Sequence, residues 1–593
     1  MIKYLKLFEG LFVLFINTDL IGVKMSALYH DFLVEDRDFK DYDDFKKNCK
    51  LKTKEDFNFA YDIVDRYATE FPGKRALVWV DDNGEEKNFT FDDISRESKR
   101  AAYWLVSKGI KKCDTVMLVL RRRYEWWILM PALHRIGAIV IPATDQLLQS
   151  DIEYRANAAD VKMIISYDNP NIQGEIDKAM PKSNTVKYLV TVGKEKRPGW
   201  ISFHEEYENL PAEFPRPVGD AATHNKDPML LYFTSGTSGY PKMVLQDYDY
   251  PIGHIITAKY WHGVVEDGLH LTIAETGWAK STWGKLYGQW IAGTALFVYD
   301  MNSFKPTKML EMISKYGLTT FCAPPTVYRY LVRQNLSKYD LSKCTRFSTA
   351  GEALNGEVYN KWLEQTGKKI YEGYGQTEST IICGNFLDYS EIRPGSMGRP
   401  NPLYDVEILN ANNNPVPVGE TGELCIHVEH GRPFGLLMGY HKDVVLTANA
   451  FDGGVYHTGD NVYMDKDGYV WFVGRKDDII KTAGYRVSPF EVESILQQHP
   501  AVMECAVTGV EDPKRGMAVK ATIVLSPGYD TKDPKEMETE LSTFAKENTA
   551  MYKCPRIFEF VKELPKTISG KIRRVEIREK DKGKAQENIK QDF

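Results

Sequence analysis

The sequence predicts an α/β fold: a large N-terminal domain of covered sheets plus a small β module, then a small α+β domain at the C-terminus. Three observations support this. Helical patterns alternate with short apolar strands over 57–225 and again over 271–382, as in parallel sheets that helices cover on both faces. Between 394 and 475 the pattern changes to short strands and turns, typical of an antiparallel module. A separate unit begins after 477.

The first alternating region contains the most definite elements. Thr90 precedes Phe91, Asp92 and Asp93, so a helix is expected from here through Leu105, because threonine is a preferred N-cap and acidic residues favour the first turn. Apolar runs predict buried strands over 116–120 and 138–142 with a helix over 124–136 between them. The runs at 163–166 and 188–191 continue the series.

The C-terminal unit has its own pattern. Ser488, Pro489 and Glu491 form a capping-box sequence with proline at the first helical position, which predicts a helix over 489–499. Strands are expected over 505–510 and 519–525, and an amphipathic helix over 535–549. The Lys/Glu-rich tail after 578 is expected to be a solvated end.

Composition limits the class of protein. A chain of 593 residues exceeds the usual size of one core, so at least two domains are expected, over 25–476 and 477–593. The formal net charge of −6 gives no broad basic surface, which argues against nucleic acid as the main partner. The eight cysteines include no C-x-x-C pair, which indicates reduced thiols in a cytoplasmic enzyme, not a disulfide framework or a zinc site.

Residues 1–24 form an ambiguous segment. Lys3 and Lys6 precede an apolar run over 7–16 that is too short to span a bilayer, and no small-x-small cleavage site follows. Met25 begins a polar stretch that resembles a natural start. We expect 1–24 to be an extension or a misassigned start, and we expect no stable membrane span.

The most informative motif lies at 234–242, where Thr-Ser-Gly-Thr-Ser-Gly-Tyr-Pro-Lys follows the apolar run 229–233. Gly236 and Gly239 allow the backbone to come close to an anion. Hydroxyl groups and one ammonium group complete a binding site for a polyphosphate. They belong to Thr234, Ser235, Thr237, Ser238 and Lys242. This is not the Walker loop, because Pro241 stands before the lysine and no hydroxyl follows it. A plain surface turn is the alternative.

Four more segments contain side chains suited to binding or catalysis. In Tyr-Glu-Gly-Tyr-Gly-Gln-Thr-Glu, at 371–378, two glycines flank Tyr374, which suits a stacked base, and Glu378 is a hard oxygen ligand for Mg²⁺. Asp460 followed by Arg475 suits a ribose diol. Lysines in glycine-containing loops end the series, at 481–486 and 565–571. Taken singly, the alternatives are a Gly-rich turn with a buried tyrosine and solvated turns.

Together and in this order, the five segments resemble the adenylate-forming enzymes, which include acyl-CoA synthetases, luciferases and peptide-synthetase adenylation domains. The resemblance covers about 57–578, and the stretch Glu-Thr-Gly-Trp-Ala-Lys-Ser at 275–281 is similar to the medium-chain acyl-CoA synthetase branch.

The resemblance implies roles for individual residues. For ATP and AMP it implies the loop 234–242 and Gly351, Glu352, Ala353, Glu372, Gly373, Tyr374, Gly375, Gln376, Asp460, Arg475 and Arg486. The implied catalytic residues are Lys571, Thr377 and Glu378, with Glu378 also the Mg²⁺ ligand. Asp477 matches the hinge about which a mobile C-terminal domain turns. For coenzyme A the candidates are Ala483, Gly484, Tyr485, Arg515 and Lys546, the last two also compatible with solvated charges.

The implied chemistry is acid activation. A carboxylate attacks the α-phosphate of ATP, pyrophosphate leaves, and a thiol then displaces AMP from the acyl adenylate. Related enzymes that are restricted to acetate carry tryptophan where this chain has Gly375, so we expect longer acids here, with Trp278 and Trp283 lining the pocket. The predicted substrate is a medium-chain, branched short-chain or arylalkanoic acid.

A protein acetyltransferase acting on Lys571 is a further expected partner. Ligases with another acceptor, luciferase-type oxidoreductases and an inactive nucleotide binder are the alternatives.

Overall fold

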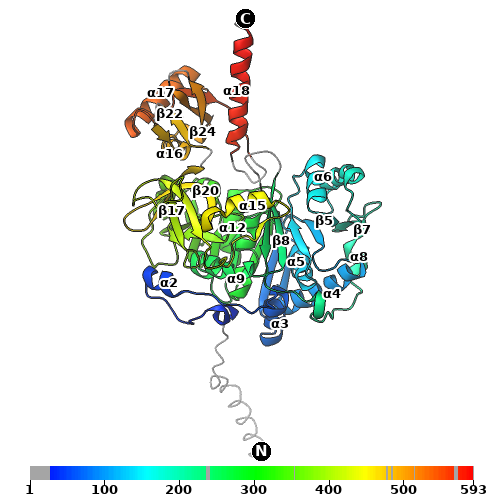
Figure 1. The fold of residues 1–593 in the computed structure, drawn as a ribbon. Helices are drawn as coiled ribbons and strands as arrows, with labels where there is room; N and C mark the ends of the chain where they lie inside the picture. Colours follow the sequence, from blue (N-terminus) through cyan, green and yellow to red (C-terminus); the bar gives the residue numbers. More distant parts are fainter. Residues whose placement is uncertain are drawn as a thin grey trace, which may run out of the picture.

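The computed structural model describes residues 27–234, 241–352, 354–475, 478–482, 485–512, 515–529, 531–566 and 572–591, with the backbone alone at 486 and 583–591. Figure 1 shows a large body of sheets and helices with a small domain, drawn in orange and red, beside it. The predicted fold class is confirmed: a mixed α/β body with a small C-terminal domain. The predicted boundary at 476/477 lies at residues outside this description and stays a prediction.

The first large sheet contains the alternating strands that the sequence predicts. Its order is β19-β9-β8-β4-β3-β5-β6-β7, and β4, β3, β5 and β6 are parallel. Two antiparallel strands, β9 and β19, form one edge. The bounds are β3 (Thr115–Val119), β4 (Ile139–Pro142), β5 (Val161–Tyr167), β6 (Tyr188–Val192), β7 (Ile201–Ser202), β8 (Pro228–Thr234), β9 (Lys242–Asp247) and β19 (Gly439–Tyr440).

The second large sheet has the order β16-β15-β14-β13-β12-β10-β11-β1-β2. The early strand β1 pairs in parallel with β11, which is far away in the sequence. The bounds are β1 (Arg75–Asp81), β2 (Glu86–Thr90), β10 (Leu269–Thr272), β11 (Ala295–Asp300), β12 (Thr320–Cys322), β13 (Arg346–Ala350), β14 (Ile370–Gly375), β15 (Ile381–Gly384) and β16 (Arg399–Pro400).

Side-chain alternation divides the core into layers. Leu77 and Trp79 of β1 face a core that both large sheets share, whereas Val78 and Val80 face a second core on the other side. Successive side chains of a strand point to opposite faces, so each sheet is buried on both sides. A third core covers the outer face of the first sheet.

Helices fill these layers. The N-cap of α4 (Phe91–Ser107) is Thr90, as the sequence predicts, and the Asp93 carboxylate accepts a hydrogen bond from the Thr90 backbone N–H, which completes a capping box. The helix α5 (Glu125–Arg135) is buried on all sides, and most of its residues are apolar. The remaining helices of the body are α2 (Tyr42–Asn48), α3 (Arg66–Glu70), α6 (Gln149–Ala158), α7 (Pro170–Ala179), α8 (Phe203–Tyr207), α9 (Tyr250–Ile255), α10 (Ala279–Gly284), α11 (Tyr287–Ile291), α12 (Pro306–Tyr316), α13 (Pro325–Leu331), α14 (Gly356–Thr366) and α15 (Val444–Ala450).

The predicted β module is an antiparallel sheet. It contains β17 (Val406–Leu409), β18 (Gly422–His427), β20 (Val455–Met464) and β21 (Val470–Arg475). A register shift between Glu423 and Cys425 leaves residues 458–460 of β20 as extra residues opposite Leu424. Such bulges re-aim side chains, and here the bulge carries Asp460.

The C-terminal domain packs helices against one sheet. Its elements are β22 (Ile480–Thr482), β23 (Tyr485–Val487), β24 (Val502–Asp512), β25 (Gly516–Leu525), β26 (Ile557–Phe560), α16 (Pro489–Leu496), α17 (Pro534–Asn548) and α18 (Arg574–Gln591). The predicted strands and helices of this unit are confirmed. The tail is helical where only a solvated end was expected, and Arg574 at its start lies 2.7 Å from a carboxylate oxygen of buried Glu493. None of the described helices has the length and apolar character that crossing a bilayer requires.

Candidate functional site

The phosphate-loop motif begins and ends on paired strands. Thr234 ends β8, Lys242 begins β9, and the two residues are direct antiparallel partners. The two ends of the motif therefore lie side by side at one end of these strands. The predicted residues Ser235, Gly236, Thr237, Ser238 and Gly239 lie outside the described residues.

A tyrosine links this loop to Glu378. The ammonium nitrogen of Lys242 lies 5.3 Å from the ring centroid of Tyr440, a cation–π distance. The Tyr440 hydroxyl donates a hydrogen bond of 3.1 Å to Glu378 Oε1. Burial, and then the Glu378 charge, raise the pKa of Tyr440, so this hydroxyl keeps its proton. The structure thus brings the predicted phosphate lysine and the predicted metal ligand to one place. Sequence reasoning missed Tyr440, because β19 has no motif of its own.

Asp460 is the centre of a second group. Its Oδ2 accepts hydrogen bonds from the Tyr374 hydroxyl and from Gln376 Nε2, the latter at 2.6 Å. Its Oδ1 lies 3.1 Å from Arg475 Nη1. A carboxylate has about four lone-pair positions, so acceptor capacity remains for a diol. Three of the predicted nucleotide residues therefore meet around the buried carboxylate of a fourth, Asp460.

Neighbouring side chains orient this group. The Tyr456 hydroxyl donates to Gln376 Oε1 at 2.9 Å, which fixes the direction of the amide. Gln246 Nε2 donates to the carbonyl oxygen of Thr377 at 3.0 Å. Burial first, and the Asp460 charge second, raise the pKa of Tyr374. Tyr456 adjoins the Thr-Gly-Asp sequence and Gln246 lies four residues after the phosphate lysine, but neither position alone signals its role.

Glu372 lies on β14 and contacts the turn that contains Gly351 and Glu352. Glu372 is buried, and its Oε1 accepts a hydrogen bond of 3.0 Å from the backbone N–H of Leu354. Burial raises the pKa of Glu372 to about 8. Glu352 instead faces outward, 3.5 Å from Arg329, and Gly351 has a φ of 102° that favours glycine. Ala353 lies outside the described residues. Glu372 thus connects β14 to the 351–354 turn.

The buried Glu372 carboxyl predicts a pH dependence of stability. Its pKa rises from 4.5 to about 8 on folding, so between these values the unfolded chain loses a proton that the folded chain keeps. Stability contributed by this group is present below pH 4.5 and is lost as pH rises to about 8, by at most about 5 kcal/mol. We expect the thermal midpoint of Glu372→Gln, relative to that of the wild type, to increase as pH rises from 5 to 8. Exposed Glu352→Gln is the matched control; a wild-type-like pH profile for Glu372→Gln contradicts the assignment.

Two of the residues predicted for the acyl pocket, Gly375 and Trp283, lie against each other. A Cβ atom at Gly375 would lie 2.3 Å from Trp283 Cη2 and 2.6 Å from the carbonyl oxygen of Thr380. The buried Trp283 indole therefore occupies the space that a larger residue at 375 would take, and Gly375 alone does not lengthen the pocket. Trp278 is half-buried immediately before α10. The roles of Trp278, Trp283 and Gly375 in an acyl pocket remain predictions.

The C-terminal domain has a hollow of about 210 Å³ next to the predicted coenzyme A residues. Its lining contains Thr482, Arg515, Val519, Met551, Tyr552, Cys554 and Arg556. Tyr485 stacks on Tyr552, with ring centroids 4.3 Å apart. Lys546 lies on α17 and is not part of this lining. Sequence reasoning missed Arg556 and Tyr552, which no motif marks.

Several predicted residues of this domain cannot be placed. Ala483, Gly484, Asp477 and Lys571 lie outside the described residues, as does the side chain of Arg486. The segments that flank Lys571 are paired, since the backbone N–H of Arg573 donates to the carbonyl oxygen of Pro565 at 2.8 Å. The roles of these residues remain predictions.

Comparisons with known proteins agree with this architecture. The family model of the AMP-binding enzymes matches residues 64–441, and that of the AMP-binding enzyme C-terminal domain matches 491–571. The human mitochondrial acyl-coenzyme A synthetase ACSM3 is 39% identical over 552 residues, which cover 92% of this chain and 93% of that protein. The rat mitochondrial acyl-coenzyme A synthetase ACSM5 is 40% identical, with 90% and 92% covered.

Solved structures are similar as well. The crystal structure of the anthranilate CoA ligase AuaEII in complex with anthranoyl-AMP has a TM-score of 0.82 at 29% identity, covering 90% of this chain and 99% of that one. The Brucella canis acyl-CoA synthetase has a TM-score of 0.67 at 30% identity, covering 89% and 95%.

Proposed function

Since this chain belongs to the family of AMP-binding enzymes, we propose that it activates a medium-chain, branched short-chain or arylalkanoic acid as an AMP-forming acyl-CoA synthetase. It is an acid–thiol ligase with ATP and coenzyme A as co-substrates. The meeting of Tyr374, Gln376 and Arg475 around Asp460 is the observation that carries the proposal, because it builds a nucleotide site from distant segments.

In the first half-reaction the acid's carboxylate oxygen forms a bond to the α-phosphorus of ATP. The bond from that phosphorus to the bridging oxygen breaks, and pyrophosphate leaves with the electron pair. We propose that Lys242 and Lys571 stabilise the negative charge that accumulates on the phosphates, and that Asp460 binds the ribose hydroxyls. Positioning and electrostatic stabilisation are sufficient for this chemistry, so no protein nucleophile is required.

Glu378 fits the proposed magnesium role. The Tyr440 hydroxyl holds one carboxylate oxygen, and carboxylate oxygens are ligands that Mg²⁺ prefers. Bound Mg²⁺ would neutralise part of the polyphosphate charge.

In the second half-reaction the coenzyme A thiol attacks the acyl carbonyl, and AMP leaves. We propose that the C-terminal domain turns about Asp477, which withdraws Lys571 and brings Tyr485 to the thiol channel. Support for coenzyme A binding comes from the hollow lined by Arg515 and Arg556, since guanidinium groups suit phosphates. Lys546 is the weaker candidate, because it is not part of that lining.

The decisive test measures pyrophosphate release from ATP against a panel of carboxylic acids, with and without coenzyme A. We expect release with acids longer than acetate and rapid turnover only when coenzyme A is present. Turnover with another acceptor would favour a different ligase, and oxygen uptake would favour a luciferase-type oxidoreductase. Acetate as the best acid would overturn the proposed acid class.

Trp283 gives a prediction about chain length. Replacing this buried indole by leucine enlarges the space beside Gly375. The ratio of kcat/KM for an acid a few methylenes longer to that for a shorter acid is therefore expected to rise about tenfold. Rates with butyrate to dodecanoate measure this. Trp290→Leu, a buried indole that bonds to the backbone of Ala76, is the matched control and should lose stability without changing the preference. An unchanged chain-length profile in Trp283→Leu would remove Trp283 from the pocket.

The cellular setting is part of the proposal. The eight cysteines, all among the described residues, form no disulfide, which suits a reducing compartment, and we propose the cytoplasm. The mammalian relatives are named mitochondrial, so imaging of a fluorescent fusion decides between the two.

We also propose that a protein acetyltransferase acts on Lys571, since acetylation removes a charge.

A further inference from the structure

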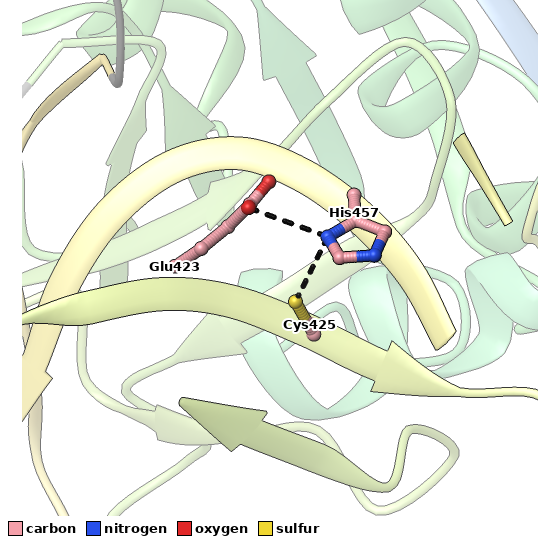
Figure 2. Close-up of side chains that lie close together, drawn as sticks. All are labelled: Glu423, Cys425 and His457. Atoms are coloured by element: carbon pink, nitrogen blue, oxygen red, sulfur yellow. Dashed lines mark hydrogen bonds and ion pairs between the residues drawn. The ribbon is translucent and has the colours of Figure 1, made fainter. Parts of the chain in front are cut away.

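Three side chains of different chemistry converge on the β module, next to the bulge that carries Asp460. Figure 2 shows Glu423, Cys425 and His457 pointing toward one another from two strands. Their ligand atoms all lie within 4.8 Å of one another. Cys425 is fully buried, and the side chains of Glu423 and His457 are 9% and 18% exposed.

The strand geometry creates this cluster. Glu423 and Cys425 are two residues apart on β18, so their side chains lie on the same face. His457 on β20 is the direct antiparallel partner of Cys425. All three side chains therefore share one face of the β module.

The two distances from His457 to the other ligands agree with a tetrahedral metal ion. His457 Nδ1 lies 3.6 Å from Cys425 Sγ and 3.3 Å from Glu423 Oε2. Zinc bonds of about 2.3 Å to sulfur and about 2.1 Å to nitrogen or oxygen, at a tetrahedral angle, separate the same pairs of atoms by about 3.6 Å and about 3.4 Å.

Outer contacts orient two of the three ligands. His457 Nε2 lies 3.2 Å from the carbonyl oxygen of Asp452, which only accepts, so Nε2 carries the proton and Nδ1 presents a lone pair to the cluster. Glu423 Oε1 accepts a hydrogen bond of 2.9 Å from the backbone N–H of Gly459, which leaves Oε2 directed at the histidine. A lone pair facing a carboxylate oxygen requires a cation between them, either a proton or a metal ion.

We propose that Glu423, Cys425 and His457 bind a divalent zinc-type metal ion that joins β18 to β20. A thiolate, an imidazole and a carboxylate select such an ion over Mg²⁺. The ion would hold the bulge that carries Gly459 and Asp460, and this site does not depend on the proposed acyl transfer.

The test uses the purified full-length protein, reduced and freed of metal by a chelator. Zn²⁺ is titrated with excess Mg²⁺ present, against a chromophoric competitor. We expect one tight equivalent and a rise of the thermal midpoint, with affinity at least tenfold lower in Cys425→Ser and His457→Gln. His427→Gln and Cys113→Ser are matched controls, because His427 lies on β18 but pairs with Glu407 of β17 at 2.9 Å, and Cys113 is an exposed thiol. Both controls should bind as the wild type does.

Two outcomes would overturn the proposal. One is the absence of a tight equivalent, which means that a proton alone holds the cluster together. The other is equal affinity in Cys425→Ser and the wild type. Co²⁺ loading of the wild type is a measurement that needs no variant: a sulfur-to-metal charge-transfer band in the near ultraviolet is expected, and a spectrum with only oxygen and nitrogen ligands contradicts the site.

Discussion

Lys571→Ala is expected to lower the rate of acid-dependent ATP–pyrophosphate exchange by at least about 100-fold, because it removes a positive charge that acts on the developing negative charge. Thioester formation from supplied acyl adenylate should continue near the wild-type rate, since that half-reaction does not use this lysine. Lys571→Gln, which mimics the neutral acetylated side chain, should behave in the same way.

Lys566→Ala is the matched control for this experiment. Lys566 lies in the same C-terminal motif but pairs with Glu504 at 2.7 Å, so its loss should leave both half-reactions close to normal. Full exchange activity in Lys571→Ala would refute the assigned role. Equal loss in the two half-reactions would show that the substitution damages the whole domain.

Asp460→Asn is expected to raise the KM for ATP by at least about tenfold and to destabilise the protein. The carboxylate accepts from Tyr374 and Gln376 and pairs with Arg475, and an amide cannot accept from all of them on both sides. Hydrogen bonds to a charged group contribute about 1.5–3 kcal/mol each, so the loss should be visible in binding and in thermal unfolding.

Asp465→Asn separates these two effects. Asp465 lies in the turn that follows β20, pairs with Arg393 at 2.7 Å and accepts from Trp471 at 3.0 Å, but it belongs to none of the nucleotide segments. We expect this control to lose stability while its KM for ATP stays near the wild-type value. An unchanged KM in Asp460→Asn would remove Asp460 from the ribose site.

Local chemistry was enough to predict much of the fold. The capping residues at Thr90 and Ser488 and the apolar runs that became β3 to β6 act within one element, so they can be read without knowing its partners. The motif at 371–378 and the pair of Asp460 and Arg475 likewise identified residues that meet in space. The helical tail was not predicted, because the pair between Arg574 and Glu493 joins distant segments.

The sequence by itself determined the elements, their order and the chemical character of the nucleotide segments, since these depend on periodicity, capping and residue type. Only the tertiary structure decided which side chains share a space. It placed the Trp283 indole where a larger residue at 375 would lie, and Tyr440 between Lys242 and Glu378. It also brought Cys425 opposite His457, 32 residues away, where cysteine spacing had predicted no zinc site. Contacts of this kind follow from strand pairing and packing between distant segments, which no local pattern records.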